Sequence, residues 1–230
     1  MLLQELTEAR ITPNAKFMAG MERAIDRVLR KYQDHLDANN DEDDIDLLAD
    51  MLDDATSKFP VGFYASDDDV KDPNEWISAE AGVDDGEFMN IVLHSKNLEG
   101  RYGPKTFKNI LMKALKHEAI HWGQYGKIGH DKLDGLTSGH QKGQEKMAKT
   151  GDPMDWMREY LKDPHELMAY ASDLADEIKD LDNPEQVLRN PEAHKADLPS
   201  YQRYRQVFEP NSKEMRQLLK YTADYYSNSI

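Results

Sequence analysis

The chain has 230 residues, of which 39% are apolar and 32% charged, and its formal net charge is −15. This composition is typical of a soluble globular protein with a polar surface, and no apolar run approaches the ~20 residues that a membrane helix needs. The acidic excess argues against nucleic-acid binding, which needs a basic surface, and the absence of cysteine excludes disulfides and leaves histidine, aspartate and glutamate as metal ligands.

The first residues carry Glu5 where a secretory signal would carry basic residues, and no small-residue cleavage site follows. We therefore expect a cytoplasmic protein. Residues 13–36 place apolar side chains at three- and four-residue steps, which predicts an amphipathic helix. The same period restarts at Ile45 and ends at Pro60, so two helices are expected before the first strand.

Two short segments read as strands. Residues 61–65 contain Val, Phe and Tyr, and residues 88–94 read Phe-Met-Asn-Ile-Val-Leu-His after a turn signal at Asp85-Gly86. The acidic stretch 67–75 lacks the ligand spacing of an EF-hand and is expected to be a solvated loop.

The next helix begins near Pro104 and carries the segment His117-Glu118-Ala119-Ile120-His121 toward its C-terminal end. Residues 126–151 are rich in glycine and predict a long loop with at most a short helix at 141–148. The remaining pattern is helical, at 153–161, 164–181, 201–208 and 212–226.

The expected fold is therefore α+β, a predominantly helical protein with a small β-sheet beside the His-Glu-x-x-His helix. Three segments are expected: an N-terminal helical segment at 1–58, a core at 59–182 that contains the long loop, and a C-terminal helical extension at 183–230.

His117 and His121 are spaced i and i+4, so on a helix both imidazoles can reach one tetrahedral Zn²⁺ at about 2.0 to 2.1 Å. Glu118 is rotated by about 100° from His117 and points beside the metal. Zinc lowers the pKa of its water toward about 7, and a neighbouring carboxylate can take the proton as the water attacks a carbonyl. The pattern predicts a hydrolytic zinc site, and the alternative is a solvated helix with two unrelated histidines.

A catalytic zinc site needs a third protein ligand and an open position. The metzincin pattern is excluded, because Gln124 and Lys127 stand where it requires glycine and histidine. Downstream of the motif, the candidate ligands are His130, His140, His165, Glu166, Asp173 and His194.

The segment Asp163-Pro164-His165-Glu166-Leu167-Met168-Ala169-Tyr170-Ala171 resembles the Pro-x-Glu-x-x-Ala-Tyr stretch that follows the zinc helix in gluzincin-like metallopeptidases, many of them encoded by bacteriophages. The resemblance covers residues 117–176, about a quarter of the chain. It implies His117, His121 and Glu166 as zinc ligands and Glu118 as the catalytic base.

The chain departs from this family at Tyr170, where many gluzincins have an aspartate that orients a ligand histidine. Asp173, on the same face, is the candidate for that role. Tyr170 is a candidate catalytic residue, with packing in the core as its alternative, and His165 is expected to be a surface or capping residue. The donor to the oxyanion stays open among Tyr125, Tyr170, His130 and His140.

The resulting hypothesis is a zinc metallopeptidase that cleaves a protein or peptide substrate held along the free edge of the strand at 89–94. The acidic net charge is compatible with a basic substrate. The alternative is a non-catalytic acidic interaction protein, such as a phage particle component or a host-factor inhibitor, that keeps a zinc-binding fold. If the chain is phage-encoded, the host cytoplasm or the virion is its expected location.

Overall fold

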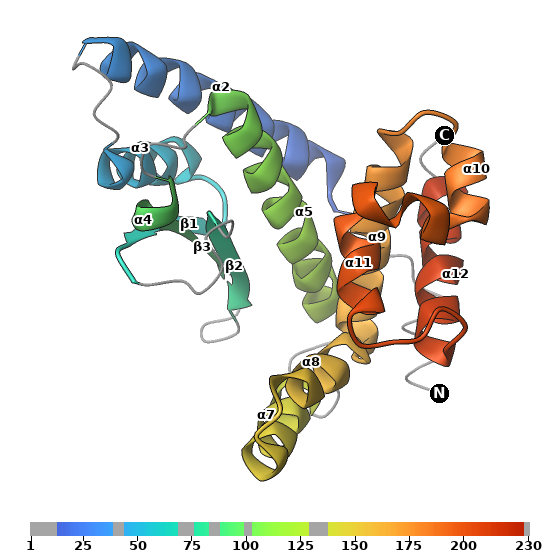
Figure 1. The fold of residues 1–230 in the computed structure, drawn as a ribbon. Coiled ribbons are helices and arrows are strands. Elements are labelled where there is room, and N and C mark those ends of the chain that lie inside the picture. The colour runs from blue at the N-terminus through green and yellow to red at the C-terminus, as the bar shows by residue number, and fades with distance from the viewer. Residues whose placement is uncertain are drawn as a thin grey trace. The chain divides into compact units, whose positions relative to one another are not determined.

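A computed structural model describes residues 13–38, 44–68, 76–82, 88–98, 103–128 and 138–227 (Figure 1). The chain divides into two compact units. We call Ile11–Gly123 the sheet unit and Gln124–Ile230 the helical unit, and each is described by itself. The division expected from the sequence, at residues 58 and 182, stays a prediction.

The sheet unit begins with the two expected helices, α2 (Ala15–Ala38) and α3 (Ile45–Thr56). Each begins at a side-chain cap: Asn14 Oδ1 accepts from the Lys16 and Phe17 amides, and Asp44 Oδ1 accepts from the Leu47 amide at 2.9 Å. The apolar stripes of both helices are buried in one core. Hydrophobic periodicity therefore located both helices correctly.

In the part of the chain that the structure describes, the sheet has three strands, β1 (Val61–Ser66), β2 (Ile77–Gly82) and β3 (Phe88–His94), in the order β1-β3-β2. β1 runs parallel to β3 and β2 runs antiparallel to it. β3 is therefore the central strand, paired on both sides, and the expectation that its edge is free for a substrate is wrong. The sequence did not predict β2, because its alanines and glycine have weak strand propensity and the pairing with β3 decides its conformation.

The short helix α4 (Ser95–Leu98) leads from β3, and α5 (Pro104–Ile128) follows. α5 buries Phe107, Leu111, Leu115 and Ala119 in the same core as the sheet residues Phe63, Ile91 and Leu93. These four side chains recur every four residues, so they lie on one face of α5 and pack that face into the core of the sheet unit. The expected fold class, mostly helical with a small sheet beside the His-Glu-x-x-His helix, is confirmed.

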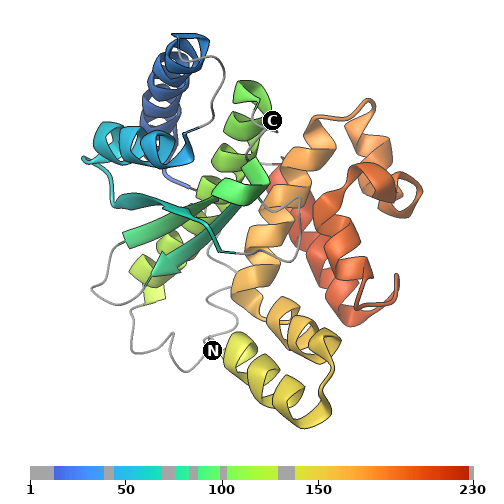
Figure 2. The ribbon, with the colours of Figure 1, turned by 60° about the vertical axis from the view of Figure 1, so that its left-hand side comes forward.

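In residues 138–227 of the helical unit, which the structure describes, α7 (Ser138–Thr150) is followed by five α-helices and one 3-10 helix. Figure 2 shows α7 and these later elements in yellow to red. These elements are α8 (Pro153–Leu161), α9 (Pro164–Lys179), α10 (Pro184–Arg189), η1 (Pro191–Asp197), α11 (Pro199–Arg205) and α12 (Lys213–Ser227). Leu174, Ile178, Tyr204, Met215 and Leu218 are among the side chains of its separate core. The Tyr204 hydroxyl, which lies inside this core, donates to the Leu161 carbonyl at 3.0 Å.

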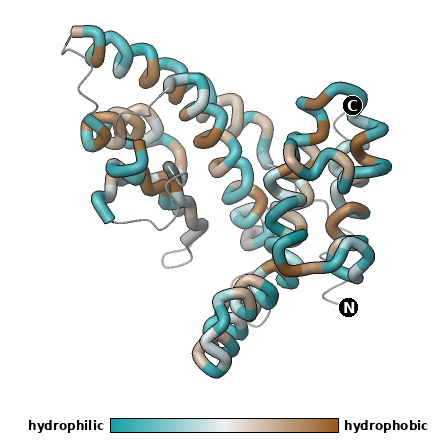
Figure 3. Tube along the Cα trace, viewed as in Figure 1, coloured by the Kyte–Doolittle hydropathy of each residue, from teal (hydrophilic) through white to brown (hydrophobic). Residues whose placement is uncertain are grey.

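Helix α7 corrects the expectation of a loop at 126–151. A regular helix occupies Ser138–Thr150, and α5 continues to Ile128. α7 carries few strongly hydrophobic residues (Figure 3), so the sequence has no apolar periodicity there that would predict a helix. It forms a hairpin with α8, and its glycines permit the close approach: a Cβ on Gly143 would lie 2.8 Å from the Trp156 carbonyl oxygen. Residues 129–137 lie outside the described part of the chain.

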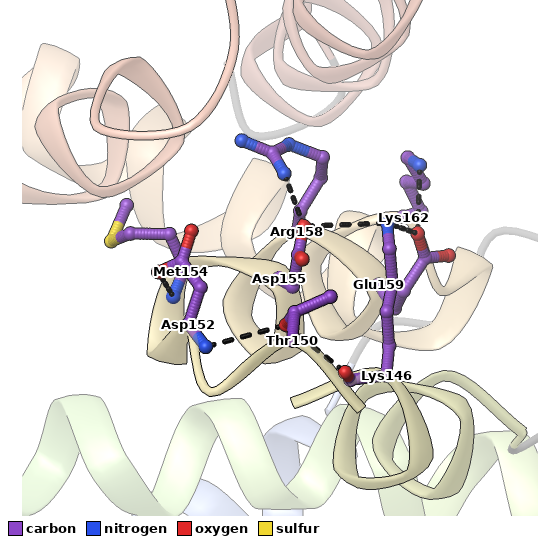
Figure 4. A network of polar contacts seen from close by, with 8 residues as sticks. All are labelled: Lys146, Thr150, Asp152, Met154, Asp155, Arg158, Glu159 and Lys162. Atoms are coloured by element: carbon purple, nitrogen blue, oxygen red, sulfur yellow. Dashed lines mark hydrogen bonds and ion pairs between the residues drawn. The ribbon is translucent and has the colours of Figure 1, made fainter. Parts of the chain in front are cut away.

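A network of charges also joins α7 to α8 (Figure 4). Lys146 Nζ lies 3.1 Å from Glu159 and 3.4 Å from Asp155, and Arg158 and Lys162 pair with the same two carboxylates. Burial opposes ionisation of Glu159, but hydrogen bonds from Lys146 and Lys162 hold the pKa of its carboxyl below the ordinary value. These pairs lie at the surface, where solvent and salt weaken them, so each of them adds little to the stability of the hairpin.

We expect Gly143→Ala to destabilise the helical unit. Alanine favours a helix over glycine by about 1 kcal/mol, but the new methyl group would meet Trp156 backbone atoms at 2.8 and 3.1 Å, and overpacking costs about 1 to 3 kcal/mol. Thermal unfolding should show a lower midpoint than the parent. Gln141→Ala, at an exposed position of the same helix, is the control and should change the midpoint little. A Gly143→Ala protein that melts above the parent would show that the hairpin is not tightly packed there.

In the part of the chain that the structure describes, no helix is both long and apolar enough to cross a membrane. The acidic segments at 69–75 and 84–87 lie outside the described residues, so the loop expected there stays a prediction.

Candidate metal centre

His117, Glu118 and His121 lie together on α5. One ligand atom from each residue lies within 4.8 Å of the others, and the two imidazole ring centroids are 4.9 Å apart with an angle of 69° between the rings. This proximity follows from the helix, since residues i and i+4 lie on one face. The structure therefore brings together the three side chains that the motif predicted.

The burial of the group follows from its place on α5. Glu118 lies three residues after Leu115 and seven after Leu111, so it continues the stripe that faces the core and is 7% exposed. His121 is 9% exposed, and His117 is half-buried. A carboxylate and an imidazole taken out of water are costly unless they have charged or polar partners. The arrangement is therefore that of a polar site built into the edge of a core.

The donor set fits a divalent transition metal. Two imidazoles and a carboxylate suit Zn²⁺ and its neighbours in the first transition row, and the chain has no thiolate that could compete. Ligand atoms about 2.1 Å from one ion lie at most about 4.2 Å apart, so atoms that lie within 4.8 Å of one another are close to the spacing that two ligands of one ion require. The donor types alone do not distinguish zinc from other such metals.

Glu166 is in the first turn of α9, as the sequence predicted. Asp163 caps this helix by accepting from the His165 amide at 2.9 Å, and Pro164 occupies the first turn. Glu166 belongs to the helical unit, whereas His117, Glu118 and His121 belong to the sheet unit. Its role as the third ligand stays a prediction.

Tyr170 and Asp173 also lie on α9. The ring of Tyr170 packs edge-to-face on Tyr204, with centroids 5.7 Å apart. Burial, followed by the charges of Glu166, Tyr170 and Asp163, raises the pKa of Tyr204 well above its ordinary value, so Tyr204 remains a neutral hydrogen-bond donor. Tyr170 therefore packs against the core of the helical unit, which was the alternative to a catalytic role, and the catalytic role stays a prediction. Asp173 is a buried carboxylate, and its expected role in orienting a ligand histidine stays a prediction.

His165 corrects an expectation. It is 5% exposed, so it is not a surface residue, and its Nδ1 lies 2.8 Å from Gln124 Oε1. Gln124 is fully buried, and the sequence indicated no role for it beyond the departure from the metzincin pattern. Its position one helical turn after His121 was the only available signal. His194 lies half-buried in η1, whereas His130 and the side chains of Tyr125 and His140 lie outside the described residues.

Comparison of the sequence with known protein families and with characterised proteins, and of the fold with solved structures, gives no match. The residues and geometry of α5 are therefore the main indication of function.

Proposed function

We propose that the chain is a zinc-dependent peptidase in which His117 and His121 hold the metal and Glu118 is the general base. The observation that supports this most directly is that ligand atoms of the two histidines and an oxygen of the neighbouring Glu118 carboxylate lie within 4.8 Å of one another, on a helix anchored in a core. A solvated helix with two unrelated histidines would not bury Glu118 to 7% and His121 to 9% exposure. Burial of these polar groups together supports a ligand-binding role.

The chemistry assigned to each residue follows from its type and place. A zinc ion supplies Lewis acidity, which polarises a carbonyl and lowers the pKa of water toward about 7. Glu118 accepts the proton from the attacking water and can return it to the leaving amine. Its buried setting keeps the carboxylate in one place and away from bulk solvent, so the proton transfer needs little reorganisation.

Glu166 is proposed as the third ligand. The support is the resemblance of its segment to the gluzincin pattern and its place in the first turn of α9, where Asp163 and Pro164 set the start of the helix. Asp173 is proposed to accept a hydrogen bond from a ligand histidine and so to orient its ring, as ligating histidines generally require.

The proposed substrate is an extended peptide. Among the strands that the structure describes, β2 lies at an edge of the order β1-β3-β2, so its outer side can hold a peptide by main-chain hydrogen bonds. The net charge of −15 favours a basic segment in the substrate, since opposite charge increases the rate of encounter.

The test of the metal site is loss of zinc on ligand removal. His117→Ala and His121→Ala should each lose most of the bound zinc at neutral pH, because affinity depends on deprotonated ligands in fixed geometry. Metal content after dialysis measures this, with circular dichroism to confirm the fold. His194→Ala, a histidine in η1, is the matched control and should keep one zinc per chain. Stoichiometric zinc in either ligand variant would contradict the assignment.

A further inference from the structure

A buried set of hydrogen bonds connects three helix ends inside the helical unit. Asp163 Oδ1 accepts from the His165 amide at 2.9 Å and its Oδ2 accepts from the Gly139 amide at 3.3 Å. His165 Nδ1 donates to Gln124 Oε1 at 2.8 Å, and Gln124 Nε2 donates to the His165 carbonyl at 3.4 Å. We call Gln124, Gly139, Asp163 and His165 the polar junction. It connects the end of α5 and the start of α7 to the start of α9.

The junction is more polar than packing alone requires. Gln124 is 0% exposed, His165 5% and Asp163 7%. A buried polar group that loses its partner costs about 1 to 3 kcal/mol, whereas an apolar side chain of similar size could fill the same space without that risk. Directional bonds instead specify one rotation and one register for the helices that they connect.

The backbone is adapted to the same arrangement. A Cβ on Gly139 would lie 2.9 Å from Asp163 Cβ and Oδ2 and 3.0 Å from the Glu159 carbonyl oxygen. Only glycine lets the start of α7 approach Asp163 this closely. Two hydrogen bonds join Gln124 to His165, and together they restrict the rotation of the two side chains more than a single bond would.

The polar junction lies close in sequence to two of the proposed metal ligands. On α5, Gln124 follows His121 by three residues, and on α9 the residue after His165 is Glu166. We propose that the polar junction positions the first turn of α9, and so the Glu166 carboxylate, for metal binding. Gln124 and Asp163 are positioning residues in this scheme and do not touch the metal. The inference depends on the proposed function, because it takes Glu166 as the third ligand.

The first experiment measures order in the metal-free protein. Gln124→Leu removes both bonds to His165 and fills most of the same space with an apolar side chain. Amide hydrogen exchange in the first turn of α9 should become at least about tenfold faster, with α12 unchanged, because the turn loses two of its tethers. Gln141→Leu, exposed on α7, is the control and should leave α9 unchanged. Unchanged exchange in the first turn of α9 of Gln124→Leu would overturn the inference.

The second experiment asks whether Gln124 acts through Glu166. Gln124→Leu should raise the zinc dissociation constant about 10- to 100-fold, as loss of outer-shell partners does. In a Glu166→Gln background the same change should have less than about a threefold effect, because the residue to be positioned is gone. Gln124→Glu keeps the acceptor for His165 Nδ1 and should restore part of the affinity. A general structural role would not give this pattern.

The outcomes separate the two proposals. If the parent binds zinc and Glu166→Gln weakens binding, but Gln124→Leu has equal effects in both backgrounds, the positioning role is wrong and the metal site stands. If the parent binds no zinc at neutral pH, the proposed function fails and the ligand-positioning role fails with it.

Discussion

Replacement of Glu118 by glutamine is expected to remove nearly all peptide hydrolysis while zinc stays bound. Glutamine has almost the same shape, so the packing beside Leu115 is kept, but its amide cannot accept the proton of the attacking water. Loss of a general base costs about 10² to 10⁴ in rate, or about 3 to 5 kcal/mol of transition-state stabilisation. The measurement is cleavage of a peptide substrate by zinc-loaded protein, with metal content determined on the same sample.

The matched control is Glu145→Gln, which makes the same chemical change at an exposed position of α7. It should cleave at the parental rate. If Glu118→Gln cleaves a confirmed substrate as fast as the parent, Glu118 is not the base. If Glu118→Gln is slow but has also lost zinc, Glu118 is a ligand, and the assignment of roles within the group must be revised.

Leu111→Ala is expected to have the largest effect on stability among the changes considered. Leu111 is 0% exposed and lies on the face of α5 that packs against the sheet, two turns before the metal group. Truncation of a buried leucine costs about 2 to 5 kcal/mol, through the lost apolar contact and the cavity that remains. Because total stability is only about 5 to 15 kcal/mol, a shift of this size should be evident in urea unfolding.

Asn109→Ala, at an exposed position of the same helix, controls for the change of residue type and should shift the unfolding midpoint little. Zinc should partly restore the stability of Leu111→Ala, since a ligand that binds only the folded state shifts the equilibrium toward it. A loss below about 1 kcal/mol without zinc would show that α5 does not depend on this face for its position.

Elements with a strong local pattern were predictable from the sequence. α2, α3, α5 and α9 each bury one apolar stripe, and β1 and β3 concentrate β-branched and aromatic residues between turn signals. β2 and α7, which the sequence did not predict, have weak periodicity and weak local propensity. β2 depends on pairing with β3, and α7 depends on glycine contacts with α8. Local sequence predicts an element when the energy that stabilises it is local or periodic, and fails when the partner is distant.

The same distinction applies to the candidate site. The motif alone predicts that His117, Glu118 and His121 lie close together, because on a helix residues i and i+4 share one face and residue i+1 lies beside them. The packing of separate elements, by contrast, buries Glu118 and His121, places β3 at the centre of the sheet, and brings Gln124 to His165 across 41 residues of chain. Burial, strand order and long-range hydrogen bonds depend on how separate elements pack, and no spacing within a single element encodes them.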